Sequence, residues 1–316
     1  MSDQIDDSQL KAEIAELEAV ASKGVGAKIA LYTRRSGPGW LQGAITLGGG
    51  SLAGALYLGV VMGYHMMWLQ PLAMILGVIM LSAISYVTLS TGRRPFEAIN
   101  RHISPALGWG WLIATIMANI VWCLPQFALG TGALTQNLFP GMSKHVAAGS
   151  ILLVSVIVVW FYNSGSKGIQ IFEIILKVMV GIVVLCFFGV VVSLTFAGTL
   201  PWGDIFAGLV PDFSSLFKPV PSLEPAIAAT GAHAQWWTDS IAELQRDKII
   251  TAFATAVGIN MTFLLPYSML RKGWGKPHRG LAIYDLSIGL IVPFVLATAC
   301  VVIAAASQFH GNATPS

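Results

Sequence analysis

Two short stretches of glycine and polar residues interrupt otherwise apolar parts of the sequence, and their residue types suit the binding of a solute. The first occupies 48–51 inside an apolar run at 38–64, and the second occupies 258–266 inside a run at 249–270. Glycine and proline weaken a helix, and backbone groups released inside a bilayer must find partners in protein or line a cavity. We predict a solute site formed by Gly48, Gly50, Ser51, Gly258, Asn260, Met261 and Thr262.

Interruptions at matching positions in two halves of a chain are typical of secondary transporters. In such proteins, unwound backbone and half-helix ends meet the solute near the middle of the bilayer. The alternative interpretation is that the small residues only let helices pack closely. The stretch at 48–51 fits both interpretations, whereas the two interruptions together favour a transport site.

The composition requires a lipid environment for most of the chain. Apolar residues make up 55% of the sequence, charged residues only 10%, and the mean hydropathy is +0.71. Such a chain cannot present a water-facing surface, so we predict an all-α polytopic membrane protein. The seven predicted spans are 38–64, 67–91, 108–139, 146–162, 169–198, 249–270 and 283–307, with the first and sixth broken.

The distribution of lysine and arginine predicts how the chain is oriented. Most basic residues of the short loops fall on one face if the N-terminus is cytoplasmic, which indicates that orientation in the plasma (inner) membrane. The predicted divisions are a cytoplasmic tail with a short amphipathic helix at 1–36, five spans at 37–198, an external insert at 199–248, two spans at 249–309 and an external tail at 310–316.

Three charged residues inside or beside the spans are expected to have structural roles. Glu173 and Lys177 lie four residues apart and are expected to form an ion pair near a membrane interface. Asp285 is expected to be an acid at the N-terminal end of the last span, where its negative charge would interact favourably with the positive end of the helix dipole.

Three segments give the sequence a family resemblance that runs from about Gly37 to Phe309. Residues 37–45, 91–98 and 274–287 read GPGWLQGAI, TGRRPFEA and WGKPHRGLAIYDLS, and their order and spacing resemble the Nramp family of divalent-metal transporters. The resemblance implies a LeuT-type helical bundle, in which two inverted repeats of five helices enclose a central site. Seven spans would supply one repeat and two helices of the second, so the resemblance also implies an incomplete bundle.

The predicted site departs from the pattern of the family that the chain resembles. By spacing from Gly37, the family's metal-binding aspartate falls on Gly48 and its asparagine on Ser51, so no carboxylate is present there. Met261 keeps the methionine of the family pattern and is the one metal ligand that we carry over. Asn119 and Gln126 are the polar residues expected along the pathway, in a region where the family carries carboxylates.

The predicted function is secondary transport of the Nramp type, in which a metal cation or small solute moves by alternating access without the usual carboxylate ligand. Two alternatives remain open: a non-transporting receptor or sensor, and a transporter of an organic solute such as an amino acid. No enzyme activity is expected, because no histidine lies in a later span to serve Ser51 as a base. The expected partners are the solute and the bilayer; no cofactor, nucleic acid or particular partner protein is predicted.

Overall fold

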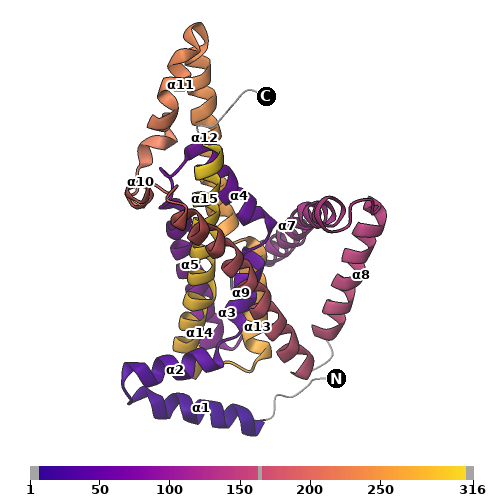
Figure 1. Cartoon of the computed structure of the whole chain (residues 1–316). Helices are drawn as coiled ribbons and strands as arrows, with labels where there is room; N and C mark the ends of the chain where they lie inside the picture. Colours follow the sequence, from indigo (N-terminus) through magenta and orange to yellow (C-terminus); the bar gives the residue numbers. More distant parts are fainter. Residues whose placement is uncertain (1–6, 163–165, 311–316) are drawn as a thin grey trace. The chain divides into compact units, whose positions relative to one another are not determined.

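The computed structural model describes residues 7–162 and 166–310 of the chain, and within these ranges it consists of helices and connecting turns, without a strand. The first half contains α1 Asp7–Ala21, α2 Val25–Arg35, α3 Pro38–Thr46, α4 Gly49–Met62, α5 Leu69–Thr91, α6 Pro95–His102, α7 Pro105–Gly132, η1 Ala133–Leu138 and α8 Lys144–Tyr162. The second half contains α9 Ser166–Phe196, α10 Trp202–Ala207, η2 Phe213–Leu216, η3 Pro221–Leu223, α11 Glu224–Ala229, η4 Gly231–His233, α12 Ala234–Ala256, α13 Ile259–Arg271, η5 Lys276–His278, α14 Arg279–Leu286, η6 Ser287–Ile291 and α15 Val292–Phe309. The chain order of these elements can be followed by colour in Figure 1.

The expected number of membrane spans is confirmed. Six helical segments of the described residues are long and apolar enough to cross a bilayer, and a seventh is the pair α3 and α4, which is bent at its break. The segments coincide with the predicted runs to within a few residues at most ends. The chain is therefore an all-α, polytopic membrane protein.

The sixth span differs from its prediction at its start. Helix α12 begins at Ala234, well inside the stretch expected to form the external insert, and not near 249. Residues 239–248 of this helix include acidic and basic side chains, which hide its start from a search for apolar runs. The helix is nevertheless amphipathic, because Ala242, Gln245, Ile249 and Ala252 are all buried at helical spacing.

The described residues divide into two compact units, each treated separately below. The first comprises the described residues within 1–49, 78–179 and 258–290, and the second comprises those within 50–77, 180–257 and 291–316.

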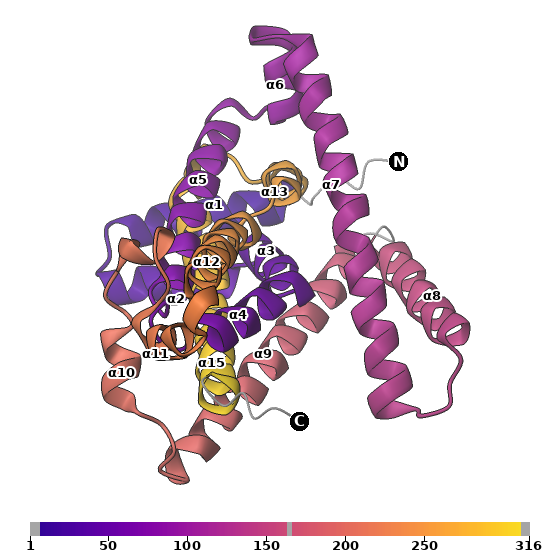
Figure 2. The same ribbon diagram turned by 90° about the horizontal axis from the view of Figure 1, so that it is seen from above.

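In the first unit, helices α3, α13 and α14 pack together, and α13 also contacts α6 and α7. Helices α7 and α8 lie side by side, as Figures 1 and 2 both show. Helix α3 approaches α14 and η6 closely: a β-carbon on Gly289 of η6 would lie 2.8 Å from the backbone nitrogen of Trp40, and one on Gly39 would collide with the carbonyl oxygen of Asp285 in α14. Glycine is needed at both positions because the two backbones touch.

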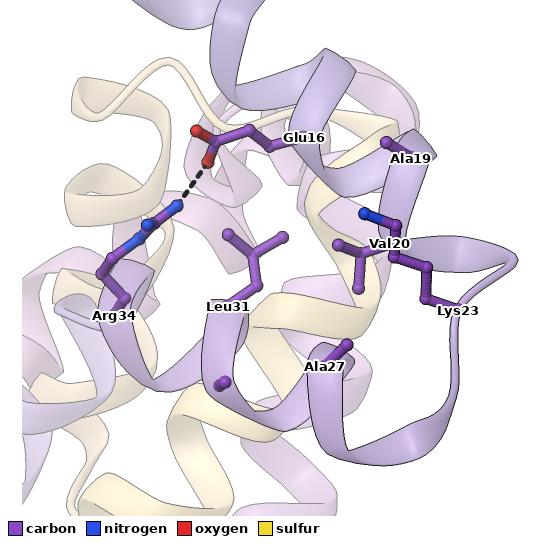
Figure 3. A pocket seen from close by; sticks show the side chains of 8 residues that line it. Glu16, Ala19, Val20, Lys23, Ala27, Leu31 and Arg34 are labelled. Carbon is purple, nitrogen blue, oxygen red and sulfur yellow. Dashed lines mark hydrogen bonds and ion pairs between the residues drawn. The ribbon is translucent and has the colours of Figure 1, made fainter.

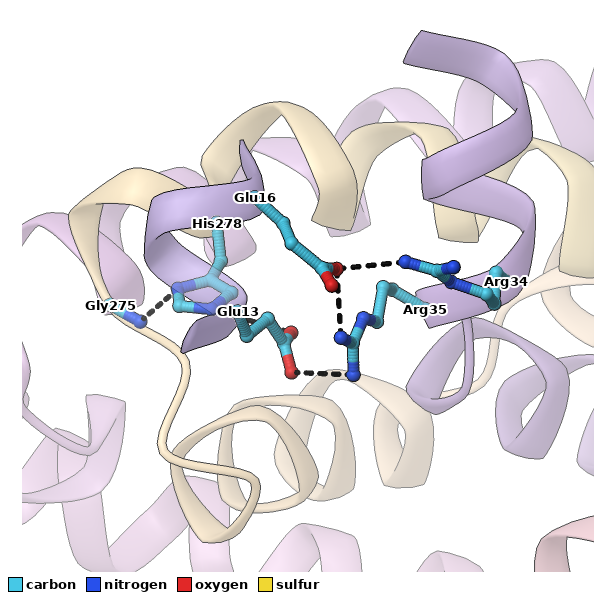
Figure 4. Close-up of polar contacts among 6 residues, drawn as sticks. All are labelled: Glu13, Glu16, Arg34, Arg35, Gly275 and His278. Carbon is cyan, nitrogen blue, oxygen red and sulfur yellow. Dashed lines mark hydrogen bonds and ion pairs between the residues drawn. The ribbon is translucent and has the colours of Figure 1, made fainter. Parts of the chain in front are cut away.

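The N-terminal hairpin of α1 and α2 belongs to the same unit and is held by charged groups. Glu16 binds Arg34 and Arg35 at 2.8 Å each, and Glu13 lies 3.6 Å from Arg35. His278, fully buried in η5, accepts the Gly275 backbone N–H on Nδ1 and places Nε2 3.5 Å from a Glu13 oxygen (Figure 4). These contacts fix α1 against the loop that joins α13 to α14.

The second unit has its own apolar core, to which α4, α12 and α15 contribute. Leu58, Met62, Ile249 and Val302 are among its buried residues. Gln245 of α12 is fully buried and fixes the preceding turns: its Oε1 accepts the Val220 N–H at 2.9 Å, and its amide nitrogen donates to the carbonyls of Ser215 and Lys218. Part of the expected insert is thus folded onto α12.

Candidate functional site

The first predicted span is interrupted at Leu47 and Gly48, whereas the other three residues of the expected stretch, Gly49, Gly50 and Ser51, form the first turn of α4. Helix α3 ends at Thr46 and α4 begins at Gly49, and the Leu47 N–H still bonds to the Gly43 carbonyl. A break of this kind leaves the first N–H groups of the second helix without partners in their own helix. The released Gly49 N–H donates to Oε1 of Gln126 on α7 at 3.1 Å, so a predicted pathway residue meets the break.

Glycine at this break allows α7 to approach. A β-carbon on Gly48 would lie 3.1 Å from the amide nitrogen of Gln126, and one on Gly49 would collide with the Leu129 side chain. The glycines therefore make room for the polar Gln126 side chain beside unwound backbone. Close packing of two apolar helices alone would not need a polar side chain there.

The sixth predicted span is interrupted at Val257 and Gly258. Both residues have extended backbone, with φ −138° and ψ 106° at Val257 and φ −79° and ψ 161° at Gly258. Helix α13 then starts at Ile259, and Oδ1 of Asn260 accepts the Met261 N–H at 3.0 Å. The Thr262 hydroxyl donates to the Ile259 carbonyl, so both polar side chains support the new helix start.

Within the first unit, the end of α3 touches the start of α13. The Thr46 hydroxyl donates to the Met261 sulfur at 3.7 Å, and both side chains are buried. Thr46 was not among the predicted site residues, because a hydroxyl in an apolar run gives no signal of its own. Because Thr46 ends α3 and Met261 lies in the first turn of α13, these two helices are neighbours beside the breaks.

Within the second unit, the start of α4 touches the end of α12. The Ser51 hydroxyl donates to the Thr255 carbonyl at 3.2 Å, and both residues are buried. Gly50 precedes Ser51 in the first turn of α4. In each unit, considered by itself, residues from one break therefore lie beside residues from the other.

The groups at the breaks are all uncharged. They are backbone carbonyls, the amides of Gln126 and Asn260, the hydroxyls of Thr46 and Ser51 and the sulfur of Met261. Among the residues that the structure describes, no group of three or more His, Cys, Asp and Glu could hold a metal ion. Neutral oxygens and a thioether bind a fully dehydrated hard divalent cation weakly, because anionic ligands normally offset the cost of dehydration.

Asn119, the other predicted pathway residue, has a local role in the structure. Its amide nitrogen donates to the carbonyl of Thr115, one turn earlier on α7, and its side chain is exposed on that helix. Among the described residues, no hydrogen bond joins Asn119 to either break.

Gln42 is a buried polar residue that sequence reasoning missed. It lies one turn before Thr46 on α3, is fully buried, and neither amide atom has a hydrogen-bond partner among the described residues. A glutamine inside an apolar run was the available signal. Burying the amide oxygen and nitrogen of a glutamine without hydrogen-bond partners costs free energy, so both atoms of Gln42 would be stabilised by a polar partner.

The expected role of Asp285 is corrected. Asp285 lies in the last turn of α14, which begins at Arg279, so it does not open the last span. Its two carboxylate oxygens instead accept the backbone N–H groups of Gly37 at 2.9 Å and Gly39 at 2.7 Å. The carboxylate thus caps α3, a different helix, and a sequence pattern cannot show that tertiary contact.

Lys177 supports the same helix start. Its ammonium donates to the Ser36 carbonyl at 3.1 Å. The side chain of its expected partner, Glu173, lies outside the described residues, as do residues 1–6 and 311–316 at the two predicted tails.

Comparisons with known proteins agree with the resemblance of the three sequence segments. The model of the family described as "Natural resistance-associated macrophage protein-like" (Nramp) matches residues 39–315. The chain is also similar to a protein of Populus trichocarpa called Metal transporter Nramp6.2. The two are 26% identical over 155 residues, which make up 48% of this chain and 27% of that protein. Since the family model covers most of its length, the chain belongs to the Nramp family and has an all-α, LeuT-like polytopic fold.

Proposed function

We propose that this protein transports a metal cation across the membrane by alternating access, with the cation bound at the two helix breaks. The observation that carries the proposal is that two spans are interrupted, at Leu47–Gly48 and at Val257–Gly258, and that Thr46 and Met261 meet across them. Family membership and the name of the plant relative support a metal as the cargo.

The breaks also support movement. Residues with extended or unwound backbone absorb dihedral changes more easily than a continuous helix does. Alternating access needs hinges of this kind where the cargo binds.

The neutral donor set bears on which cation is carried. A cation that keeps part of its water shell needs fewer charged ligands, because the retained waters still compensate its charge. Mg²⁺ loses its waters reluctantly and is therefore the cation that best suits this site. Met261 adds a soft sulfur donor, which would favour softer metals over Mg²⁺ if the ion were dehydrated.

Two other functions are also compatible with the absence of a carboxylate at positions 48 and 51, which are Gly48 and Ser51. One is transport of an organic solute such as an amino acid, whose carboxylate can bind at a half-helix N-terminus. The other is a receptor or sensor that keeps the helix breaks but moves nothing.

Transport assays in proteoliposomes distinguish these functions. The purified chain is tested for uptake of Mg²⁺, Mn²⁺ and amino acids, together with Met261→Ala and, as a matched control, Met117→Ala, whose side chain is 61% exposed on α7. We expect cation uptake by the wild-type chain, a changed ratio of Mn²⁺ to Mg²⁺ uptake in Met261→Ala, and wild-type behaviour in Met117→Ala. Uptake of amino acids alone, or of none of these solutes, would contradict the proposal.

A further inference from the structure

A groove runs between α1 and α2, outside the helix breaks. It is an open groove of about 560 Å³, and Figure 3 shows its lining side chains. Its residues are Glu16, Ala19, Val20, Lys23, Ala27, Ala30, Leu31 and Arg34. The floor is thus made of small and branched apolar side chains, and charged groups stand only at its rim.

The rim of the groove is cationic. Its one carboxylate, Glu16, is already held by Arg34 and by Arg35 at 2.8 Å each. Lys23 has no side-chain partner among the described residues, and the Arg34 side chain remains 64% exposed. The lining thus has two cations, Lys23 and Arg34, and one carboxylate, Glu16, which gives it a net charge of +1.

Covalent connection keeps this groove at the membrane surface. Only Ser36 and Gly37 separate α2 from α3, the first half of a membrane span. Helix α2 also exposes Val25 and Ile29, at 74% and 47%, on a helix that carries Lys28. Exposed apolar residues interspersed with lysine are typical of helices that lie in the lipid headgroup region.

We propose that the groove between α1 and α2 binds an anionic phospholipid of the surrounding bilayer. Its phosphate would lie at Lys23, and part of an acyl chain would cover Val20, Ala27 and Leu31 toward the Arg34 end of the groove (Figure 3). An apolar floor of this size has no contact to offer a free phosphate ion. A zwitterionic lipid would fill the floor but would bring no net charge to the cationic rim.

Photo-crosslinking of the full chain in nanodiscs tests the proposal. Phosphatidylglycerol and phosphatidylcholine, each with a diazirine in one acyl chain, are compared, and labelled peptides are identified by mass spectrometry. We expect labelling of the peptide around Ala27–Leu31 with phosphatidylglycerol, at several times the level seen with phosphatidylcholine. Lys23→Gln should lower that labelling roughly fivefold, the effect of one basic residue near an anionic surface.

The control is Lys11→Gln, which removes a lysine from α1 that does not line the groove, and its labelling should match that of the wild type. Equal labelling by the two lipids, or no loss in Lys23→Gln, would overturn the proposal. So would complete loss of labelling on addition of millimolar inorganic phosphate, because the site would then bind a free anion. None of these results depends on transport.

Discussion

Asp285 shows how a single buried residue can determine the start of a membrane helix. The carboxylate is 1% exposed, and each oxygen accepts one backbone N–H from the first residues around α3. Those N–H groups have no partner inside their own helix, so the acid satisfies donors that the membrane could not.

Replacing Asp285 by Asn should destabilise the protein by about 2 kcal/mol, because the amide keeps one acceptor oxygen but turns an NH₂ group toward the second donor. Thermal unfolding in detergent measures the effect. Asp247→Asn, which changes an exposed acid on α12, is the control and should be nearly neutral. Equal melting temperatures for the two variants would contradict the capping role.

Glu13 makes the attachment of α1 dependent on pH. The His278 imidazole beside it, together with the Arg35 guanidinium, holds the pKa of the Glu13 carboxyl below its usual 4.5, although partial burial opposes the shift. A depressed folded-state pKa means that ionised Glu13 stabilises the fold above pH 4.5. This contribution is lost as the pH falls from 4.5 through the lower folded-state value.

Glu13→Gln should therefore lower the melting temperature at pH 7, and its difference from the wild type should shrink as the pH falls below 4.5. Melting curves between pH 7 and pH 3 check this. Glu18→Gln, on an exposed position of the same helix, should follow the wild type throughout. A constant difference between Glu13→Gln and the wild type at every pH would refute the link to ionisation.

At the scale of helices, the contact of α3 with α14 and η6 depends on glycine. A side chain on Gly39 would strike the backbone of Asp285, and neither backbone can move without disturbing the cap of α3. Gly39→Ala should thus cost about 1–3 kcal/mol of stability, as overpacking commonly does. The matched change is Gly110→Ala on α7, where nothing lies within 4 Å.

Gly110→Ala should be neutral or slightly stabilising, because alanine is the better helix former. Melting temperature and the yield of monodisperse protein in detergent compare the two variants. If both changes had the same small effect, the proposed contact between backbones would be disproved.

The helices show which features a sequence reveals. Apolar runs predicted the spans, because lipid requires the same composition along a whole crossing. The breaks at Gly48 and Gly258 were predictable from residues that weaken helices. The start of α12 was not predictable in this way. Its buried residues Ala242 and Gln245 lie among charged residues, and only their helical spacing marks them as one face of a helix.

Partners within the site were harder to predict than its positions. Gln126 was expected near the pathway, but its bond to the Gly49 N–H depends on how α7 packs. The same is true of Thr46 with Met261 and of Asp285 with α3. Each is a contact between distant parts of the chain, which local spacing in one sequence does not encode.

At the scale of the whole molecule, the predicted orientation can be tested by thiol labelling. In a variant whose three cysteines are replaced by alanine, single cysteines are placed at Val25 and at Phe217, which are 74% and 81% exposed. A membrane-impermeant maleimide added to intact cells should label Phe217→Cys and should reach Val25→Cys only after lysis, because basic loops resist translocation. The reverse pattern would show that the N-terminus is external.

The short connection between α2 and α3 has a mechanical consequence. Ser36 and Gly37 are tied by the Lys177 ammonium and the Asp285 carboxylate, so they leave little slack between the two helices. A tilt of α3 must therefore pull on α2, and through the Glu16 ion pairs on α1. The surface hairpin would then follow any tilt of the first span, and a lipid bound between α1 and α2, as proposed above, would resist that tilt.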